Sequence, residues 1–322
     1  MGFEDIAFLT ENTFSQEIVR IEEALEALRH HGEFTTREGI RLFYEYFTPK
    51  TSRGSVVIVH GLSEFTKKYY ELAWYLTAQG YSVFLYDQRG HGLSHRDTDR
   101  PELIHVQSFE GLAADLQDYL EAVVLPAEKG PLYLYAHSMG GAVGLLHLAL
   151  YPEQFRKAVI TSPLLQPTTN NLPPFLFQWG TGIHRALRGG KKKFLFSREY
   201  DPQRPYVHVP GDSESRVRHC LNHRNRDRRY QSTPMTVDCV YHSLGLKKRL
   251  LGDAVTKAIR TPILMLCAGK DTMVKIPPQE EFDCRCPQCH RIVLPDANHA
   301  LLTCRDKILQ QVLRLVLEHY EN

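Results

Sequence analysis

The segment PLYLYAHSMGGAVGLLHLAL, from Pro131 to Leu150, places a potential nucleophile, Ser138, between two different patterns. The apolar run up to Ala136 is typical of a short buried strand, and the small and aliphatic residues after Ser138 are typical of a helix packed on a sheet. A serine at such a turn presents its hydroxyl where a base can reach it. The spacing is that of a nucleophile elbow, G-x-S-x-G, with Ala136 at the first glycine position. The alternative interpretation is an ordinary buried serine in a strand-to-helix turn.

A second segment could supply the other half of an acyl-transfer site. The β-branched run Ser55 to Val59 predicts a strand buried on both faces, and it stops at HGLSE, residues 60–64. A turn beside the elbow can aim backbone N–H groups at a developing oxyanion. We therefore expect the amides of Leu62 and Met139 to form an oxyanion hole. The alternative is a plain glycine-containing turn.

Four sequence blocks together resemble one branch of the α/β-hydrolases: HGLSE at 60, DQRGHGLS at 87, AHSMGGA at 136 and TSPLL at 161. That branch holds the monoacylglycerol lipases and the bacterial lysophospholipases. The long insertion and the stretch RHCLNHRNRDRRY are more similar to the lysophospholipases. The resemblance covers about residues 34–318. It implies an α/β fold with a mostly parallel central sheet, helices on both faces and an inserted cap.

The resemblance also implies a triad in the chain order Ser, Asp, His. Asp271 follows the strand-like run 261–268, and His299 lies in the loop after the predicted strand 291–294. In this arrangement Ser138 is the nucleophile, His299 takes and returns its proton, and Asp271 orients the imidazole. Asp296 is the competing acid, but we favour Asp271 because the acid should come from a different strand end. Three other histidines are interpreted as loop or packing residues: His60, His91 and His137.

The expected site residues lie on a core formed by two separate parts of the chain. We expect an N-terminal helical extension over 1–32, a core over 33–163 and 251–322, and a cap over 164–250. Ser15 is the expected N-cap of the first helix. A hairpin is expected around Glu38-Gly39.

The predicted cap is basic, with 16 Lys and Arg against 6 Asp and Glu over residues 164–250. Such an asymmetry favours an anionic partner. We expect Arg224, Arg226 and Arg228 to attract a phosphate-bearing head group or an anionic membrane surface. The alternative is a solvated surface, or ion pairs with the acidic core. A nucleic-acid partner is not expected, because no nucleic-acid motif accompanies the charge.

Composition sets the remaining expectations. The chain has 322 residues, 43% hydrophobic and 24% charged, with no apolar run near the ~20 residues of a membrane helix. The start lacks the pattern of a secretory signal, and the seven cysteines favour a reducing compartment. We therefore expect a cytoplasmic protein that can lie at the inner face of a membrane. Cys284, Cys286, Cys289 and His290 resemble a zinc motif, but their crowding at a helix-to-strand junction argues against a metal site and leaves reactive thiols or a disulfide open.

We thus predict a serine hydrolase that cleaves the carboxylic ester of a lysophospholipid through an acyl-enzyme. Water is the only co-reactant, so no cofactor is expected. The alternatives are a monoacylglycerol lipase or broad carboxylesterase, an acyltransferase that passes the acyl group to an alcohol, and a binding protein without catalysis. The sequence leaves the head group, the acyl chain and the oligomeric state open.

Overall fold

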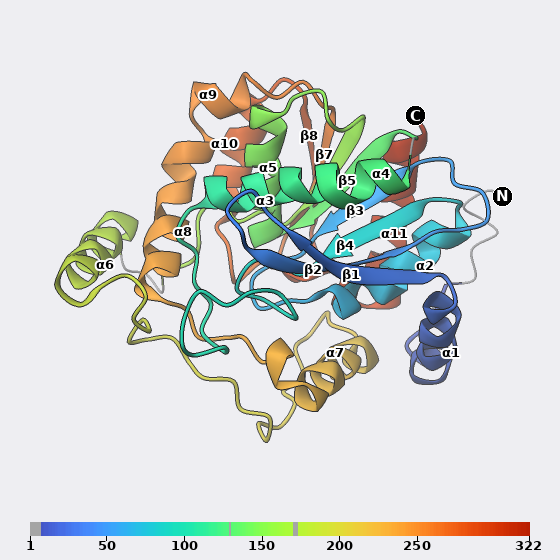
Figure 1. Ribbon diagram of the computed structural model, residues 1–322, viewed down its shortest axis with the longest axis horizontal. Coiled ribbons are helices and arrows are strands. Elements are labelled where there is room, and N and C mark those ends of the chain that lie inside the picture. The colour runs from blue at the N-terminus through green and yellow to red at the C-terminus, as the bar shows by residue number, and fades with distance from the viewer. Residues whose placement is uncertain (1–7, 129, 170–172) are drawn as a thin grey trace.

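A computed structural model describes residues 8–128, 130–169 and 173–322 of the chain (Figure 1). Its centre is an eight-stranded sheet in the order β1-β2-β4-β3-β5-β6-β7-β8. The β1–β2 and β2–β4 pairs are antiparallel, and all the other pairs are parallel. The strands are β1 (Arg29–Thr35), β2 (Arg41–Phe47), β3 (Ser55–Val59), β4 (Ser82–Tyr86), β5 (Leu132–His137), β6 (Lys157–Thr161), β7 (Ile263–Ala268) and β8 (Cys289–Leu294).

The central strands are buried on both faces, and each face has its own hydrophobic core. In β3, Val57 and Val59 belong to one core, whereas Val56 and Ile58 belong to the other. This alternation follows from the two-residue period of a strand. It explains why Ser55–Val59 reads as a continuous apolar run.

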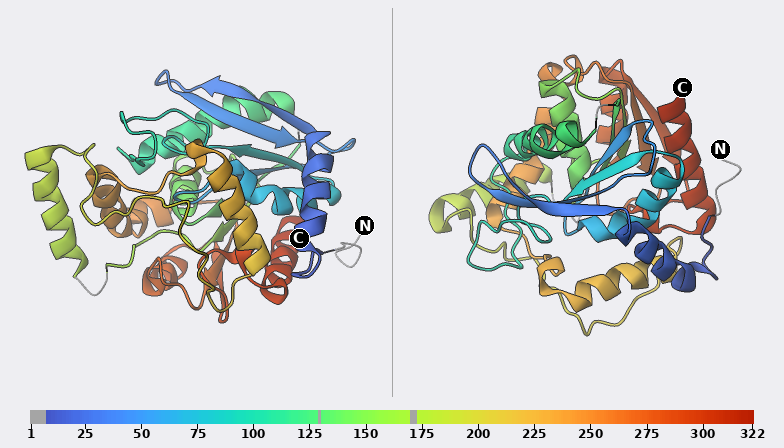
Figure 2. Two further views of the ribbon diagram at one scale, coloured as in Figure 1. Left: turned by 90° about the horizontal axis from the view of Figure 1, so that it is seen from below. Right: turned by 45° about the vertical axis from the view of Figure 1, so that its right-hand side comes forward.

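Helices cover both faces of the sheet (Figures 1 and 2). One core is closed by α3 (Phe109–Tyr119), η3 (Leu120–Val124), α5 (Met139–Leu150), α9 (Asp253–Thr256) and α10 (Ile276–Arg285). The other is closed by α1 (Phe14–Glu26), η2 (Thr66–Tyr69), α2 (Tyr70–Ala78) and α11 (Asp306–Glu321). The short α4 (Leu125–Ala127) and η5 (Leu301–Thr303) complete the core elements. The expected α/β-hydrolase arrangement is confirmed.

Two details at the N-terminal end differ from expectation. The first helix begins at Phe14 with Thr13 as its N-cap residue, so the assignment of Ser15 as the cap was wrong. The strand β1 already begins at Arg29, so the expected boundary between 32 and 33 falls inside a strand. The hairpin itself lies where the sequence placed it, and Gly39 has the positive φ of 79° that the turn requires.

The insertion between β6 and β7 contains α6 (Pro174–Arg188), α7 (Glu214–Arg226), η4 (Arg228–Tyr230) and α8 (Val237–Leu250). Figure 1 shows α6 projecting from one end of the molecule and α7 lying next to α1. Leu165 near the start of the insertion and Leu246 near its end are buried in the core. Cys239 of α8 belongs to the same core, so only part of the segment 164–250 lies outside the core. Within the described residues, no helix combines the length and apolar character needed to cross a bilayer.

Candidate active site

Ser138 lies between the end of β5 and the first residue of α5, in a conformation that L-residues rarely adopt. Its φ is 52° and its ψ is −114°. Backbone strain of this kind is typical of a nucleophile elbow. The close approach of helix and strand explains the neighbouring glycine, because a Cβ on Gly140 would lie 2.5 Å from the His60 carbonyl oxygen. Ala136 fits at the first elbow position because Gly144 faces its methyl group from α5.

The three residues proposed for the triad meet in space. His299 Nε2 lies 2.9 Å from Ser138 Oγ, and His299 Nδ1 lies 2.7 Å from Asp271 Oδ2. The Asp271 side chain is 1% exposed, and its Oδ1 accepts the N–H groups of Met273 and Val274 at 2.8 and 2.9 Å. The carboxylate is therefore fixed on one side by backbone and faces the imidazole on the other. This geometry is that of a serine–histidine–carboxylate relay.

The alternative acid lies elsewhere. The Asp296 side chain is 78% exposed and forms an ion pair with Lys270 at 2.8 Å. It is separated from His299 by only two residues, but its carboxylate is directed at solvent. The structure therefore brings Asp271, and not Asp296, into contact with the imidazole.

The loop after β3 lies against the elbow. A Cβ on Gly61 would be 3.2 Å from the His137 ring, which shows how closely the loop approaches the residue before Ser138. Met139 is the first residue of α5, so its N–H has no carbonyl acceptor within the helix. Leu62 is in the same loop as Gly61. The two expected oxyanion donors thus belong to neighbouring segments.

A buried carboxylate that the sequence reasoning missed holds this loop. Glu64 accepts the Gly61 N–H at 2.7 Å and the Tyr69 hydroxyl at 2.6 Å, and it forms an ion pair with Lys68. Burial alone would raise the pKa of Glu64, but the charge of Lys68 and its hydrogen bonds lower it well below its usual range. Glu64 therefore stays ionised and fixes the backbone beside Leu62. Its position three residues after Gly61 was the only signal in the sequence.

The three histidines interpreted as packing residues occupy such places. His60 Nε2 accepts the Gln88 N–H at 2.9 Å, and the ring of His91 packs on that of His60. Burial lowers the pKa of His60 to about 4. His137 contacts Thr161 through Nδ1 at 3.0 Å, its ring lies 5.1 Å from that of His299, and burial lowers its pKa to about 3. All three rings are therefore neutral near pH 7.

The cap arginines divide into two groups. Arg224 is directed inward: it donates to the carbonyl oxygens of Tyr230 and Ser232 at 3.1 and 3.0 Å, and its guanidinium lies over the Tyr200 ring. It joins segments of the cap, a role that neither the head-group expectation nor its alternative included. Arg226 and Arg228 are exposed. The neighbouring Tyr230 ring stacks on Phe65 at 4.3 Å, which places this part of the cap over the loop after β3.

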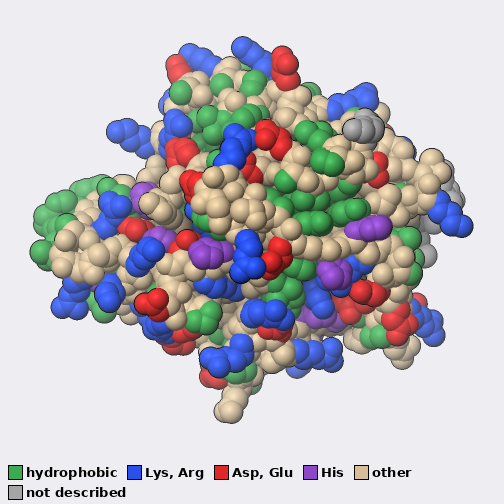
Figure 3. Space-filling view, viewed as in Figure 1, with side chains coloured by type: hydrophobic (Ala, Val, Ile, Leu, Met, Phe, Trp, Pro, Cys, Tyr) green, Lys and Arg blue, Asp and Glu red, His purple; other side chains and the backbone are tan. Residues whose placement is uncertain are grey.

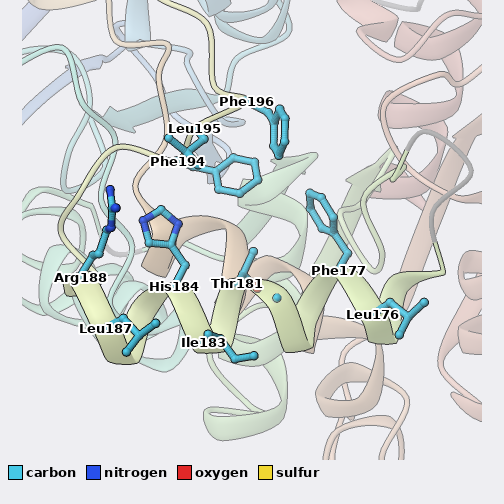
Figure 4. Close-up of a pocket in the computed structure, with 11 residues that line it drawn as sticks. Leu176, Phe177, Thr181, Ile183, His184, Leu187, Arg188, Phe194, Leu195 and Phe196 are labelled. Carbon is cyan, nitrogen blue, oxygen red and sulfur yellow. The ribbon is translucent and has the colours of Figure 1, made fainter.

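A wide cavity lies away from the triad. It has a volume of about 590 Å³ and lies on the cap between α6 and residues 194–196. Figure 4 shows Phe177 directed from α6 toward Phe194 and Phe196, with ring centroids 5.6 Å apart for the first pair. None of its lining residues belongs to the triad. Ser138 itself is 8% exposed.

The cysteine motif near the C-terminus does not assemble into a ligand cluster. Cys284 is exposed, Cys286 is buried, Cys289 begins β8, and all seven cysteines are free thiols. Burial raises the pKa of the Cys289 thiol well above its usual range. Such protonated thiols are poor metal ligands and weak nucleophiles.

The sheet order, the strained serine and the relay to His299 and Asp271 define an α/β-hydrolase with a serine hydrolase site. A family model described as "Serine aminopeptidase, S33" (Hydrolase_4) matches residues 50–306, and the chain belongs to this family. The predicted resemblance to bacterial lysophospholipases and monoacylglycerol lipases is confirmed, and the likenesses support an ester hydrolase.

Two relatives and two solved structures illustrate these likenesses. Lysophospholipase L2 of Escherichia coli K12 is 27% identical over 309 residues, covering 91% of this chain and 87% of the relative. Monoglyceride lipase of Rattus norvegicus is 33% identical over 129 residues, covering 40% and 41%. A soluble variant of monoglyceride lipase from Saccharomyces cerevisiae aligns with a TM-score of 0.69 at 18% identity, covering 91% and 94%. A carboxyl esterase from Bacillus coagulans aligns with a TM-score of 0.70 at 16% identity, covering 90% and 98%, which shows the shared fold.

Proposed function

We propose that this protein hydrolyses the carboxylic ester of a lysophospholipid through an acyl-enzyme on Ser138. The observation that carries the proposal is the unbroken hydrogen-bonded relay from Ser138 through His299 to Asp271. The full-length likeness to Escherichia coli lysophospholipase L2 supports the substrate class, because it spans the cap as well as the core. The monoglyceride lipase of Rattus norvegicus is similar over a shorter stretch.

The chemistry follows from the positions of these atoms. Ser138 Oγ attacks the ester carbonyl carbon while His299 Nε2 takes the hydroxyl proton, and the amides of Leu62 and Met139 hold the developing oxyanion. The tetrahedral intermediate collapses as His299 returns that proton to the departing glycerol oxygen. Water then attacks the acyl-enzyme by the same route, so that a fatty acid leaves and Ser138 is restored. Asp271 orients the ring through its contact with Nδ1 and stabilises the imidazolium.

A substrate panel tests this function. Purified protein is assayed with lysophosphatidylcholine, lysophosphatidylethanolamine, monoolein, short nitrophenyl esters and an aminoacyl nitroanilide. We expect the highest kcat/KM on a lysophospholipid, and no turnover by Ser138→Ala. A clear preference for monoolein would favour a monoacylglycerol lipase, and turnover of the anilide would favour peptidase chemistry. If a fluorophosphonate probe failed to label Ser138 in the folded protein, the proposal of catalysis would be refuted.

The exposed cap arginines are proposed to attract the phosphate of the head group. Arg226 and Arg228 carry this proposal, because Arg224 is engaged with cap carbonyl groups. Reversing both charges should lower kcat/KM for lysophospholipids more than for monoolein, since only the former carry a phosphate. An equal effect on both substrates would refute a head-group role.

We also propose that the cap meets an anionic lipid surface through α6. Phe175, Trp179 and Leu187 are 69%, 69% and 78% exposed, and Figure 3 shows hydrophobic side chains gathered at the end of the molecule where α6 lies. Arg188 and the exposed Lys191 follow on the chain. An apolar helix face bordered by cations is typical of helices that lie in a membrane interface.

Sedimentation with vesicles tests this contact. The protein should sediment with phosphatidylglycerol-containing vesicles more than with pure phosphatidylcholine vesicles. Since one basic residue near an anionic surface contributes about 1 kcal/mol, neutralising Lys191 should weaken binding about fivefold. Lys50→Gln, an exposed lysine after β2, is the control. Equal sedimentation of wild type and of Trp179→Ser would refute the α6 contact.

A further inference from the structure

Three potential metal ligands converge where the N-terminal helix meets the cap. Glu22 lies on α1, and His219 and His223 lie one turn apart on α7. Both imidazole Nε2 atoms are 2.9 Å from the same Glu22 oxygen, Oε1, and they are 3.1 Å from each other. Three donor atoms thus form a nearly equilateral triangle. The sequence analysis did not single out these residues for chemistry.

This triangle is close to the one that metal ligands form. Ligand atoms about 2.05 Å from a tetrahedral zinc ion lie about 3.3 Å apart, only slightly farther than these donors. Residues at i and i+4 of a helix share one face, so two histidines at this spacing can bind one ion. The third ligand comes from another helix, α1, so that three protein ligands leave one position open.

Without a metal ion, hydrogen bonds hold the three side chains together. If both Nε2 atoms carry protons, both N–H groups donate to Glu22 Oε1, since a carboxylate oxygen has two lone pairs. A divalent cation can replace these hydrogen bonds, because it accepts one lone pair from each of the three atoms when both Nε2 atoms are unprotonated.

The surroundings also suit a metal ion. The side chains of Glu22, His219 and His223 are 25%, 22% and 11% exposed, so a water molecule can reach a fourth position. The ring of Phe14 packs edge-on against His219 at 5.6 Å, which orients that imidazole. Among the described residues, this is the group of three whose donor atoms lie within 4.8 Å of one another.

We infer that Glu22, His219 and His223 form a binding site for a divalent transition metal ion such as zinc, which fastens the cap to the N-terminal helix. The donor set of two imidazoles and one carboxylate favours zinc or cobalt over calcium or magnesium, which prefer oxygen ligands. The site joins α1 to α7, and the guanidinium of Arg216 on α7 also lies over the Phe14 ring of α1 at 5.0 Å. It is separate from the triad, so its metal has no part in ester cleavage.

Cobalt binding tests the site directly. Full-length protein without a polyhistidine tag, purified in chelator-free buffer, is titrated with Co²⁺ and then with Zn²⁺. Wild type should bind one Co²⁺ per chain, with visible d–d bands and without thiolate-to-cobalt charge transfer, and Zn²⁺ should displace it. The Tm should rise with metal concentration and fall back on chelation.

Matched variants assign the ligands. His219→Gln/His223→Gln should lose more than the ~100-fold in affinity that even outer-shell changes can cost. If the double variant does not fold, Glu22→Gln, which keeps the side-chain shape, takes its place and should also weaken metal binding. Cys284→Ser/Cys289→Ser is the control and should bind as wild type does. The proposal is overturned if wild type takes up no stoichiometric metal, if the histidine variant binds equally, or if the cysteine variant loses the metal.

Discussion

Replacing Asp271 by Asn tests the relay with a change of one atom. The two N–H groups of Met273 and Val274 hold Oδ1 at 2.8 and 2.9 Å, so the amide oxygen of Asn must stay there. Its NH₂ group is then forced to face His299 Nδ1, where Oδ2 now lies at 2.7 Å. The imidazole must accept at Nδ1 and carry its proton on Nε2. It can then no longer take the proton of Ser138.

The expected loss follows from that tautomer. In serine hydrolases the wrong tautomer lowers kcat by about 10⁴. This factor corresponds to about 5.4 kcal/mol of activation free energy. Turning the Asn side chain over would restore an acceptor for Nδ1 but would set an NH₂ group against two N–H donors. Neither orientation of the Asn side chain therefore restores the hydrogen bonds that Asp271 makes.

Steady-state hydrolysis of a nitrophenyl ester measures the effect. Asp271→Asn should retain fluorophosphonate labelling of Ser138 only at a greatly reduced rate, and its urea midpoint should stay near that of wild type. Asp296→Asn is the matched control, because its exposed carboxylate contacts only Lys270, and its kcat should stay within twofold. If Asp271→Asn kept kcat within tenfold of wild type, the assignment of Asp271 as the orienting acid would be wrong.

Three further predictions concern the scaffold. Gly140→Ala should lower the unfolding free energy by about 1–3 kcal/mol or more, because its Cβ overlaps the end of β3. It should also abolish fluorophosphonate labelling of Ser138, and unchanged labelling would contradict this. Arg216→Met should lower the unfolding free energy in urea by about 3–5 kcal/mol, since it leaves Glu71 buried without its cation, and an additional Glu71→Gln should recover part of the loss. Burial lowers the pKa of His147 to about 3, so its contribution to stability is present above pH 6.5 and is lost as the pH falls toward the folded pKa. Between pH 6.5 and 4 this amounts to about 3 kcal/mol; His147→Gln should flatten the pH dependence, whereas the exposed His30→Gln should not.

The proposed triad could be named from the sequence because the family resemblance implied its chain order and because each of its members follows a predicted strand. Parallel strands end at one edge of the sheet, so Ser138 after β5, Asp271 after β7 and His299 after β8 had to lie close together. Strand identity needed only apolar runs and glycine-rich turns. The order of the central strands in the sheet was not needed for this prediction.

The roles of the cap residues were harder to predict, because the sequence does not show whether a charged side chain points inward or toward solvent. Arg216 and Arg224 lie on the same helix as Arg226, yet the first two are held by core carboxylates or cap carbonyl groups and the third is exposed. Which face of α7 turns inward depends on contacts with Glu71, far away in the sequence. Glu64 was missed for the same reason, since its role rests on the fold of one loop.

The cap is bound to the loop that carries His299, and this contact constrains how the cap can move. Gly211 accepts the N–H of Arg305 at 3.0 Å, and the Ser213 N–H donates to the Thr303 carbonyl at 2.8 Å. Asn298, next to His299, donates to Asp212 at 2.8 Å. A cap that lifted as one piece would break these bonds and release the support of the histidine loop. Any cap movement that keeps the relay intact must therefore leave these contacts in place, and α6, with its exposed apolar face, takes no part in them.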